Sequence, residues 1–355
     1  MATFPSKVNY ATGDILTATN MNDVGGAINL LDGAQYAGGK NRVLNSNMSI
    51  WQRGTSFANP SNAYTADRWL GSAAVSGTIT RQTTSDTTNL PFIQYCLRYQ
   101  RTAAATSTSA LNINQSFETV NSIPLAGKTV TLSFYARAGA NYSSASSVLN
   151  VQLLTGTGTD QNGYTTIYTG NAAAINQNAT LTTTWQRFTY TATLPSTATE
   201  LCLTIGYTPV GTAGAADYYE ITGVQLEAAN TASPYAPNGA TFQAELAACQ
   251  RYLPAITTSS ASEIGSGYNL STTQPFLFIP FQVPARVAPT GITATAANYA
   301  VRNVTGSTIS LTAISFNNAS VTGGALLGTV AAGLIAGQGT TVQLNGTLLF
   351  TGCEL

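Results

Sequence analysis

Apolar and polar residues alternate through the middle of the chain, which is the pattern of half-buried β-strands. The stretches VLNVQLL and LCLTIGY show this alternation, and turns rich in Gly, Asn and Thr separate such stretches, with no helical pattern between them. In KTVTLSFYARA the apolar positions are Val130, Leu132, Phe134 and Ala136. The pattern predicts a mainly β protein, with an antiparallel jelly roll or β-sandwich.

A first segment that breaks the alternation is TATNMNDVGGAINLLDGA near the N-terminus. Its apolar residues recur at i, i+3, i+7 and i+10, a narrow seam typical of helix–helix packing; they are Met21, Val24, Ile28 and Leu31. Gly25 and Gly26 each cost about 1 kcal/mol in a helix interior, so this short helix needs a partner. Copies of itself, another protein or the next domain would each serve.

A second helix is predicted in NGATFQAELAACQRYLP, which ends at Pro254. Its predicted buried face consists of Phe242, Leu246, Cys249 and Leu253. Beyond it, STTQPFLFIPFQVPARVAP, STISLTAIS, TTVQLNG and TLLFTG return to strand patterns. They predict a smaller C-terminal β domain, or strands that join the first domain. The Ser/Thr-rich stretch TTSSASEIGSG is predicted to be a loop.

A length of 355 residues exceeds what one hydrophobic core usually organises. The pattern divides the chain into an N-terminal attachment or oligomerisation segment, a jelly-roll domain, a connector helix and a C-terminal β domain. Their predicted bounds are 1–45, 46–238, 239–254 and 255–355.

Charge is scarce, because Asp, Glu, Lys and Arg make up 8% of the chain and sum to a net charge of zero. Without a basic surface, nucleic-acid binding is not expected. No apolar run is long enough for a membrane span, and the N-terminus lacks a signal-peptide pattern, so we expect a soluble chain made in a cytoplasm. Histidine is absent, which excludes Ser/His/Asp triads and His-ligated zinc.

The four cysteines, at positions 96, 202, 249 and 353, form no close pair. Their spacing gives no metal site, and free, buried thiols are expected in a reducing compartment. No cofactor or metal is predicted.

Two of the three tryptophans lie in VLNSNMSIWQRGTSFANPSNAYTADRWL, residues 43–70. Its notable side chains are Trp51, Arg53, Asp67, Arg68 and Trp69. If adjacent strands carry Trp51 and Trp69, both indoles can pack in the core. The three charged residues would then form a network at the edge of the core that holds the intervening loop. The alternative is that Trp51 or Trp69 is an exposed platform on which a sugar stacks.

Carboxylates give little sign of catalysis. Asp217 and Glu220 would point to opposite faces of a strand, which disfavours them as the acid pair of a glycosidase. Glu227 is expected to accept hydrogen bonds from backbone or arginine donors. The chain is therefore predicted not to be an enzyme.

Two stretches resemble the jelly-roll domain of bacteriophage tail fibre and minor structural proteins. The first is NRVLNSNMSIWQRGTSF with YTADRWL, and the second is VQLEAANTASPYAPNGATFQAELAACQRYL. In the second, the candidate structural residues are Gln225, Glu227, Gln250, Arg251 and Tyr252. Met48 and Ala228 depart from the usual pattern. The resemblance covers residues 43–252 and implies a fold similar to carbohydrate-binding modules.

The resemblance implies a virion component, assembled in the bacterial cytoplasm, with a homotrimer as the usual state. The leading hypothesis is a tail fibre attached to the tail or baseplate through residues 1–45, with the β domains facing a host glycan. Attachment to the head or neck is an alternative within that class. A glycan-cleaving tail spike is the alternative from a different class.

Overall fold

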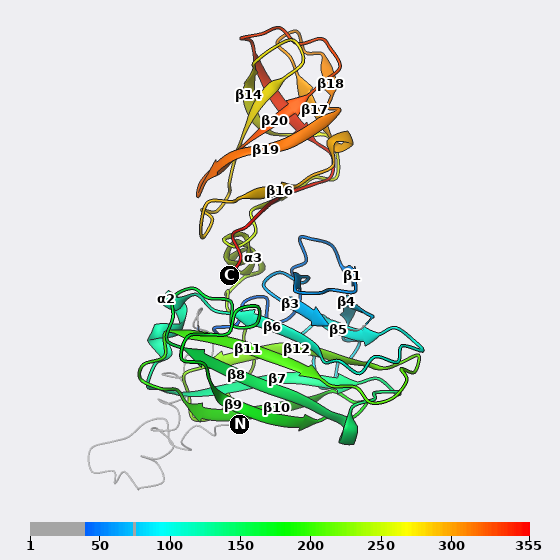
Figure 1. The fold of residues 1–355 in the computed structure, drawn as a ribbon, viewed down its shortest axis with the longest axis vertical. Coiled ribbons are helices and arrows are strands. Elements are labelled where there is room, and N and C mark those ends of the chain that lie inside the picture. Colours follow the sequence, from blue (N-terminus) through cyan, green and yellow to red (C-terminus); the bar gives the residue numbers. More distant parts are fainter. Residues whose placement is uncertain (1–39, 74–75) are drawn as a thin grey trace, which may run out of the picture.

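A computed structural model of the chain describes residues 40–73 and 76–355. The N-terminal seam of Met21, Val24, Ile28 and Leu31 lies outside these residues. Two β domains follow one another along the long axis of the molecule, and the helix α3 (Phe242–Gln250) lies between them (Figure 1). The C-terminal end of the chain returns to α3, so the last residues lie beside the junction of the two domains (Figure 1).

The first domain contains two six-stranded antiparallel sheets. Sheet A has the order β1 (Ser56–Ala58), β4 (Gly77–Thr83), β5 (Tyr95–Arg101), β12 (Tyr218–Glu227), β7 (Thr129–Ala138) and β10 (Gln186–Thr193). Sheet B has the order β2 (Ala63–Tyr64), β3 (Leu70–Ala73), β6 (Leu111–Ser116), β11 (Glu200–Tyr207), β8 (Val148–Gly156) and β9 (Ala172–Thr180). Short helical turns lie at α2 (Thr119–Ser122), Ile123–Leu125 and Ala145–Ser147.

The chain crosses from one sheet to the other at most connections, as in a jelly roll. The main core fills the space between the sheets, where the alternating apolar residues of β7, β8 and β11 meet. Leu132, Leu153 and Leu203 are fully buried in it. This confirms the prediction of an antiparallel β-sandwich.

The outer face of sheet A is less exposed than a half-buried strand pattern implies. Thr131 and Ser133 on β7 are buried because residues 228–237 lie over them, and the Thr131 hydroxyl donates to the carbonyl of Ala229 at 2.7 Å. The loop before β5 covers another part, where the third tryptophan, Trp185, packs with Leu90. Polar residues are tolerated under these coverings because each finds a hydrogen-bond partner.

The second domain combines a three-stranded and a seven-stranded antiparallel sheet. The smaller sheet has the order β13 (Ala255–Thr257), β22 (Thr347–Thr351) and β16 (Gly291–Thr293). The larger has the order β18 (Thr308–Ser310), β17 (Tyr299–Arg302), β21 (Gly339–Leu344), β14 (Ser262–Asn269), β15 (Pro275–Pro280), β20 (Gly323–Thr329) and β19 (Ala313–Ser320). A short helical turn at Ala296–Asn298 precedes β17.

Strands β13 to β22 pair with one another and enclose a core of their own, which includes Leu277, Val342 and Phe350. The stretch 257–267, predicted to be a loop, instead contributes most of strand β14. The prediction was wrong because small polar residues were taken as loop formers. Gly265 and Gly267 lie so close to the backbone of β15 that a side chain there would collide with it.

Helix α3 buries only part of the predicted face: Cys249 and Leu253 are buried, as predicted, whereas Phe242 is 55% exposed and Leu246 is partly exposed. Glu245, which was not predicted, is buried as well. Thr241 is the N-cap of the helix, and its side chain accepts a hydrogen bond from the backbone N–H of Ala244. The apolar spacing misled because Glu245, a buried carboxylate, faces the first domain.

A fully buried ion pair joins Arg101, the last residue of β5, to Asp217, which directly precedes β12. The two side chains are 0% exposed and 2.8 Å apart. Asp217 also accepts hydrogen bonds from Tyr207 and Ser143, while Arg101 donates to the carbonyls of three loop residues, Ala105, Ser107 and Gly211. One charge pair therefore fixes several loops.

Replacing Asp217 with Asn leaves the Arg101 charge buried without its counter-ion, and we expect a loss of about 3–5 kcal/mol in unfolding free energy. Urea unfolding followed by tryptophan fluorescence reports on this domain, because all three tryptophans lie in it. The matched control is Lys128→Gln, which removes an exposed charge from the same domain and is expected to change nothing measurable. Equal effects of the two substitutions would contradict the assignment.

Candidate functional site

The first motif consists of turns and the short strands β1 and β2, with Trp51 in the turns before β1 and Trp69 directly before β3. The two tryptophans are therefore not carried by adjacent strands. Asn45, Met48 and Arg68 have positive φ angles of 50°, 56° and 69°. Such angles are uncommon outside glycine, and asparagine tolerates them best. Hydrogen bonds from side chains, rather than a strand ladder, satisfy the backbone of these turns.

Asn45 holds these turns together. Its amide nitrogen donates to the carbonyls of Ile50 at 2.8 Å and Asp67 at 3.0 Å, and its amide oxygen accepts from the N–H of Ile50. The indole N–H of Trp69 donates to the Asn45 carbonyl at 3.1 Å. Residues some twenty positions apart are thereby fastened to one asparagine.

Both tryptophans of the motif lie in the main core. Trp51 is 8% exposed and Trp69 is 0% exposed, and the Trp51 indole N–H donates to the carbonyl of Met48 at 2.7 Å. Neither ring presents a free face on which a sugar could stack. The structure places them as anchors of the turns.

The sequence led us to expect that Asp67 would pair with the neighbouring arginines, but it forms no ion pair with them. Its two oxygens accept from the backbone N–H and the side-chain amide of Gln52. Burial raises the pKa of Asp67 above its ordinary value, and the Arg53 charge and the Gln52 hydrogen bonds oppose that rise. The carboxylate orders the turn after Trp51.

The partner of both arginines is Glu354, near the end of the second domain's chain. Arg53 lies 3.0 Å from its carboxylate, and the buried Arg68 forms an ion pair with the other oxygen. The guanidinium of Arg68 also stacks on the ring of Tyr252 at 3.6 Å and donates to the carbonyl of Ser116 at 2.6 Å. We call Glu354 with Arg53 and Arg68 the latch.

Neighbouring contacts reinforce the latch. The main-chain oxygen of Leu355 accepts from the Tyr64 hydroxyl at 2.9 Å and from the Asn162 side chain at 2.7 Å. Arg286 donates to the carbonyls of Cys353 and Glu354. Residues of the second domain are therefore bound directly to the first.

The second motif reaches the same junction from the other direction. Gln225 and Glu227, on β12, hold Ser233 and so fasten the segment that covers sheet A. Glu227 accepts from the backbone N–H of Ser233 at 2.9 Å, as expected, and Lys40 lies 3.1 Å from its carboxylate. Burial alone would raise the pKa of Glu227, but hydrogen bonds from Ser233 and Gln225 and the interaction with Lys40 bring it below its ordinary value.

The last three motif residues follow one another at the end of α3. Gln250 donates to Gln52 of the first motif and to the carbonyl of Ala255 at the start of β13. Arg251 and Tyr252 both donate to the carboxylate of Glu118, at 2.8 Å and 2.6 Å. These contacts tie the helix to the first domain and its exit to the second.

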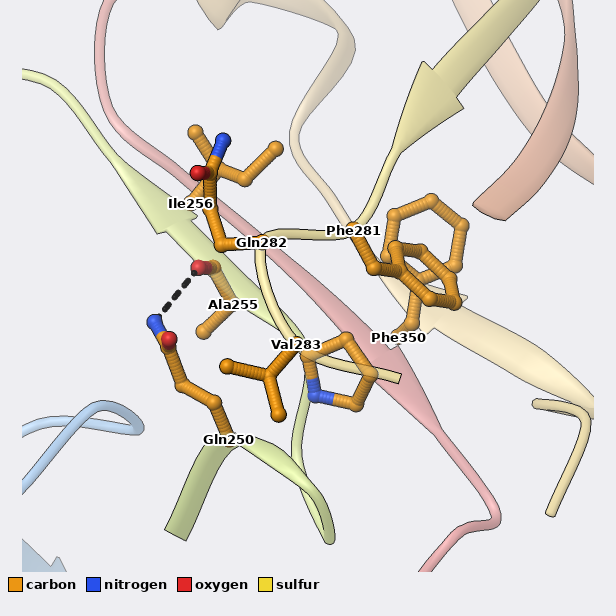
Figure 2. A pocket seen from close by; sticks show the side chains of 8 residues that line it. Gln250, Ala255, Ile256, Phe281, Gln282, Val283 and Phe350 are labelled. Atoms are coloured by element: carbon orange, nitrogen blue, oxygen red, sulfur yellow. Dashed lines mark hydrogen bonds between the residues drawn. The ribbon is translucent and has the colours of Figure 1, made fainter. Parts of the chain in front are cut away.

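Figure 2 shows the joint on the side of the second domain. The Gln250 side chain reaches from the end of α3 to Ala255, beside Val283 and Gln282. The rings of Phe281 and Phe350 pack edge to face, 4.7 Å between centroids. The space they leave, about 10 Å³, holds at most one water molecule, so this is a packed joint and no ligand pocket.

The outer face of sheet B carries a cluster of uncharged amides. Alternation places them opposite the core residues of β6, β8 and β9; they are Asn112, Asn114, Asn150, Gln152, Asn176 and Asn178. Asn150 donates to Asn176 at 3.3 Å and to Asn178 at 3.1 Å. The buried amide oxygen of Asn114 has no partner in the structure. We call these six residues the amide face.

The carboxylates weighed as a catalytic pair are both held in ion pairs. Asp217 is the buried partner of Arg101, and Glu220 accepts from Arg98 and Arg137 on the outer face of sheet A. Asp217 contacts the core residue Tyr207, so the two acids lie on opposite faces. Within residues 40–73 and 76–355, no group of His, Cys, Asp or Glu could hold a metal ion.

The four thiols are unpaired and buried. Burial raises the pKa of Cys202 and of Cys353 to about 11, which leaves both protonated at neutral pH. In the part of the chain that the structure describes, no helix is long and apolar enough to cross a membrane.

Sequence reasoning missed Glu354, Glu118 and the amide face. Glu118 and Glu354 carry no local pattern, because their partners lie 133 and 286 positions away for Arg251 and Arg68. The amide face had a signal: LNINQS, LNVQLL and INQN each place amides between apolar residues.

Comparison with protein-family models gives no match, and comparison with curated proteins gives none either. Solved structures resemble about half of the chain. A CBM4 domain covers 52% of this chain and 97% of its own, at 18% identity and a TM-score of 0.33. A xylan-binding CBM22 domain covers 51% and 99%, at 14% identity and a TM-score of 0.30.

The enzymatically active domain of tailspike protein 4 from bacteriophage CBA120 is also similar. It covers 53% of this chain and 21% of its own, at 16% identity and a TM-score of 0.33. The structural neighbours are thus carbohydrate-binding jelly-roll domains and one phage tailspike. At this level of similarity they say nothing about what this chain binds.

The latch makes a specific prediction. Glu354→Gln removes the counter-ion of the buried Arg68, and we expect a loss of about 3–5 kcal/mol in unfolding free energy. Small-angle scattering should also show a larger radius of gyration as the domains separate. The control is Asp160→Asn, which removes a partly exposed pair with Arg286 at 3.4 Å. An unchanged scattering profile for Glu354→Gln would show that the latch does not position the domains.

A second prediction concerns pH. Burial alone would raise the pKa of Glu118, but hydrogen bonds from Arg251 and Tyr252 bring it below its ordinary value of 4.5. Ionised Glu118 therefore stabilises the fold above pH 4.5, and this contribution is lost as the pH falls through the lower folded pKa. In thermal unfolding, the melting temperature of Glu118→Gln should lie below that of the natural chain at pH 7, and this difference should shrink towards pH 3. A deficit independent of pH would rule out this linkage.

Proposed function

We propose that the chain is a non-enzymatic structural component of a bacteriophage virion, a tail fibre that contacts the host surface with its β domains. The observation that carries this proposal is the convergence of both motifs on one junction. Through these residues the sequence resembles tail fibre proteins, and they join the two β domains: Asn45 binds Glu245 on α3, Arg68 pairs with Glu354, and Gln250 donates to Ala255. A part that must transmit position along a fibre requires such a fixed junction.

The polarity of the fibre follows from the order of the domains. We place the attachment segment in residues 1–45 and the second domain, residues 255–355, away from the particle. The loops of the second domain and the amide face of the first would then be available to the host. We further propose a homotrimer, which rests on the N-terminal seam of the sequence.

A host glycan is the contact that the surface suits best. Neutral sugars present hydroxyl groups, and amide side chains both donate to and accept from hydroxyls. Apart from the buried Asn114, the amide face offers five such side chains on one sheet face, with no charge among them. Binding through these groups would depend little on salt.

The test is immunoelectron microscopy of virions produced from the genome that encodes the chain, with antibodies raised against residues 255–355. Label at the distal ends of tail fibres is expected, together with inhibition of adsorption when purified chain is added in excess. The purified chain should have three times the mass of one chain by light scattering.

Other outcomes have defined meanings. Label on the head or neck would replace the tail fibre with a head-attached fibre. Unlabelled, fully infective virions would overturn the proposal of a virion component. Release of reducing sugar from host polysaccharide by the purified chain would overturn the non-enzymatic assignment.

A further inference from the structure

A cleft of about 480 Å³ lies between the start of α3 and the strands β4 and β5. It is separate from the amide face, because β4 and β5 belong to sheet A. Its lining includes Asn47 of the first motif and Phe242, the first residue of α3. Asn47 and Phe242 belong neither to the latch nor to the core, so neither of these explains why they line an open cleft.

Two phenylalanines line this cleft and remain exposed. Phe92, in the loop before β5, is 95% exposed, and Phe242 is 55% exposed. Large aromatic side chains in water are costly, and their presence in one cleft marks a binding site more often than chance. Flat aromatic rings suit the C–H face of a sugar ring.

The cleft also contains a positive charge without a counter-ion. The guanidinium of Arg81 lies over the ring of Tyr95, 4.6 Å from its centroid. Among the residues described in the structure, Arg81 forms no ion pair, although it is partly buried beside its aromatic neighbour. The other charged lining residue, Glu245, is 3% exposed and accepts from the backbone N–H groups of Asn45 and Gly239. The charge that faces the cleft is therefore positive.

Uncharged hydrogen-bonding groups complete the lining. The Asn47 amide oxygen accepts from the Ser49 hydroxyl at 2.8 Å, which leaves its N–H groups available. Gln94 is exposed, and its side chain makes no hydrogen bond to the parts of the chain that the structure describes. The cleft thus combines aromatic rings, amides and one arginine.

We propose that this cleft binds a saccharide that carries a carboxylate, with the sugar ring on Phe92 and Phe242 and the carboxylate on Arg81. Arginine binds carboxylates through two parallel hydrogen bonds, which lysine cannot supply. Asn47 and Gln94 bind the sugar hydroxyls. The proposal deepens the proposed function, on which it rests, by adding an acidic-sugar site to the uncharged amide face.

The experiment is isothermal titration of the full chain with two matched pairs of probes: trigalacturonic acid with its methyl ester, and sialyllactose with lactose. At least one acid should bind more tightly than its uncharged counterpart. Arg81→Gln should weaken that acid by about ten- to hundredfold, the effect of one lost charge-assisted contact, and leave the uncharged probe unchanged. Phe92→Ala should weaken both members of the pair.

Two matched controls lie in the second domain. Arg302→Gln removes an exposed arginine, and Phe278→Ala removes a phenylalanine that is 47% exposed. Both should bind as the natural chain does. Binding of no acid, or an acid preference that survives Arg81→Gln, would overturn the proposal.

The same variants separate this proposal from the proposed function. If Arg81→Gln and Phe92→Ala chains still block phage adsorption as well as the natural chain, the fibre function stands and the cleft is not its receptor site. If the natural chain itself fails to block adsorption but binds the acid through Arg81, the cleft proposal stands and the fibre function fails.

Discussion

A guanidinium group removed from water needs an anion and hydrogen-bond acceptors, and Arg68 meets this need only when three distant parts of the chain assemble. Glu354 supplies the anion, Ser116 a carbonyl and Tyr252 an aromatic face. Burial of such a charge without those partners would cost several kcal/mol. The fold of the first domain, the exit of α3 and the last residues of the second domain are therefore mutually dependent.

Other charged residues of the molecule are also used in ion pairs that join separate parts of the fold. Arg101 pairs with Asp217 inside the first domain, and Glu220 lies between two arginines on adjacent strands. These charges fix the positions of strands and loops. The surface is left to hydroxyl and amide groups, which explains how a chain with so few charged residues can present polar binding faces.

Structure that depends on short-range sequence patterns could be predicted, whereas contacts between residues far apart in the sequence could not. The alternation in β7, β8 and β11 identified the sandwich and its core, because inward residues of a strand must be apolar. The turns around Asn45 carry no such pattern, since one asparagine side chain there takes the place of a ladder of backbone bonds. The partner of Arg68 lies at residue 354, and no spacing rule connects the two.

Helix α3 contributes residues both to the junction of the two domains and to the proposed acidic-sugar cleft. The apolar pattern predicted Phe242 as a buried residue, yet the helix turns Glu245 inward instead, where it accepts from Asn45 and Gly239. The bond to Asn45 fixes the first turn of the helix to the motif that carries Asn47. Phe242 lies one turn from this buried carboxylate and lines the same cleft, where it remains exposed. The side chain that the sequence pattern misplaced is therefore the one through which the junction shapes a binding surface.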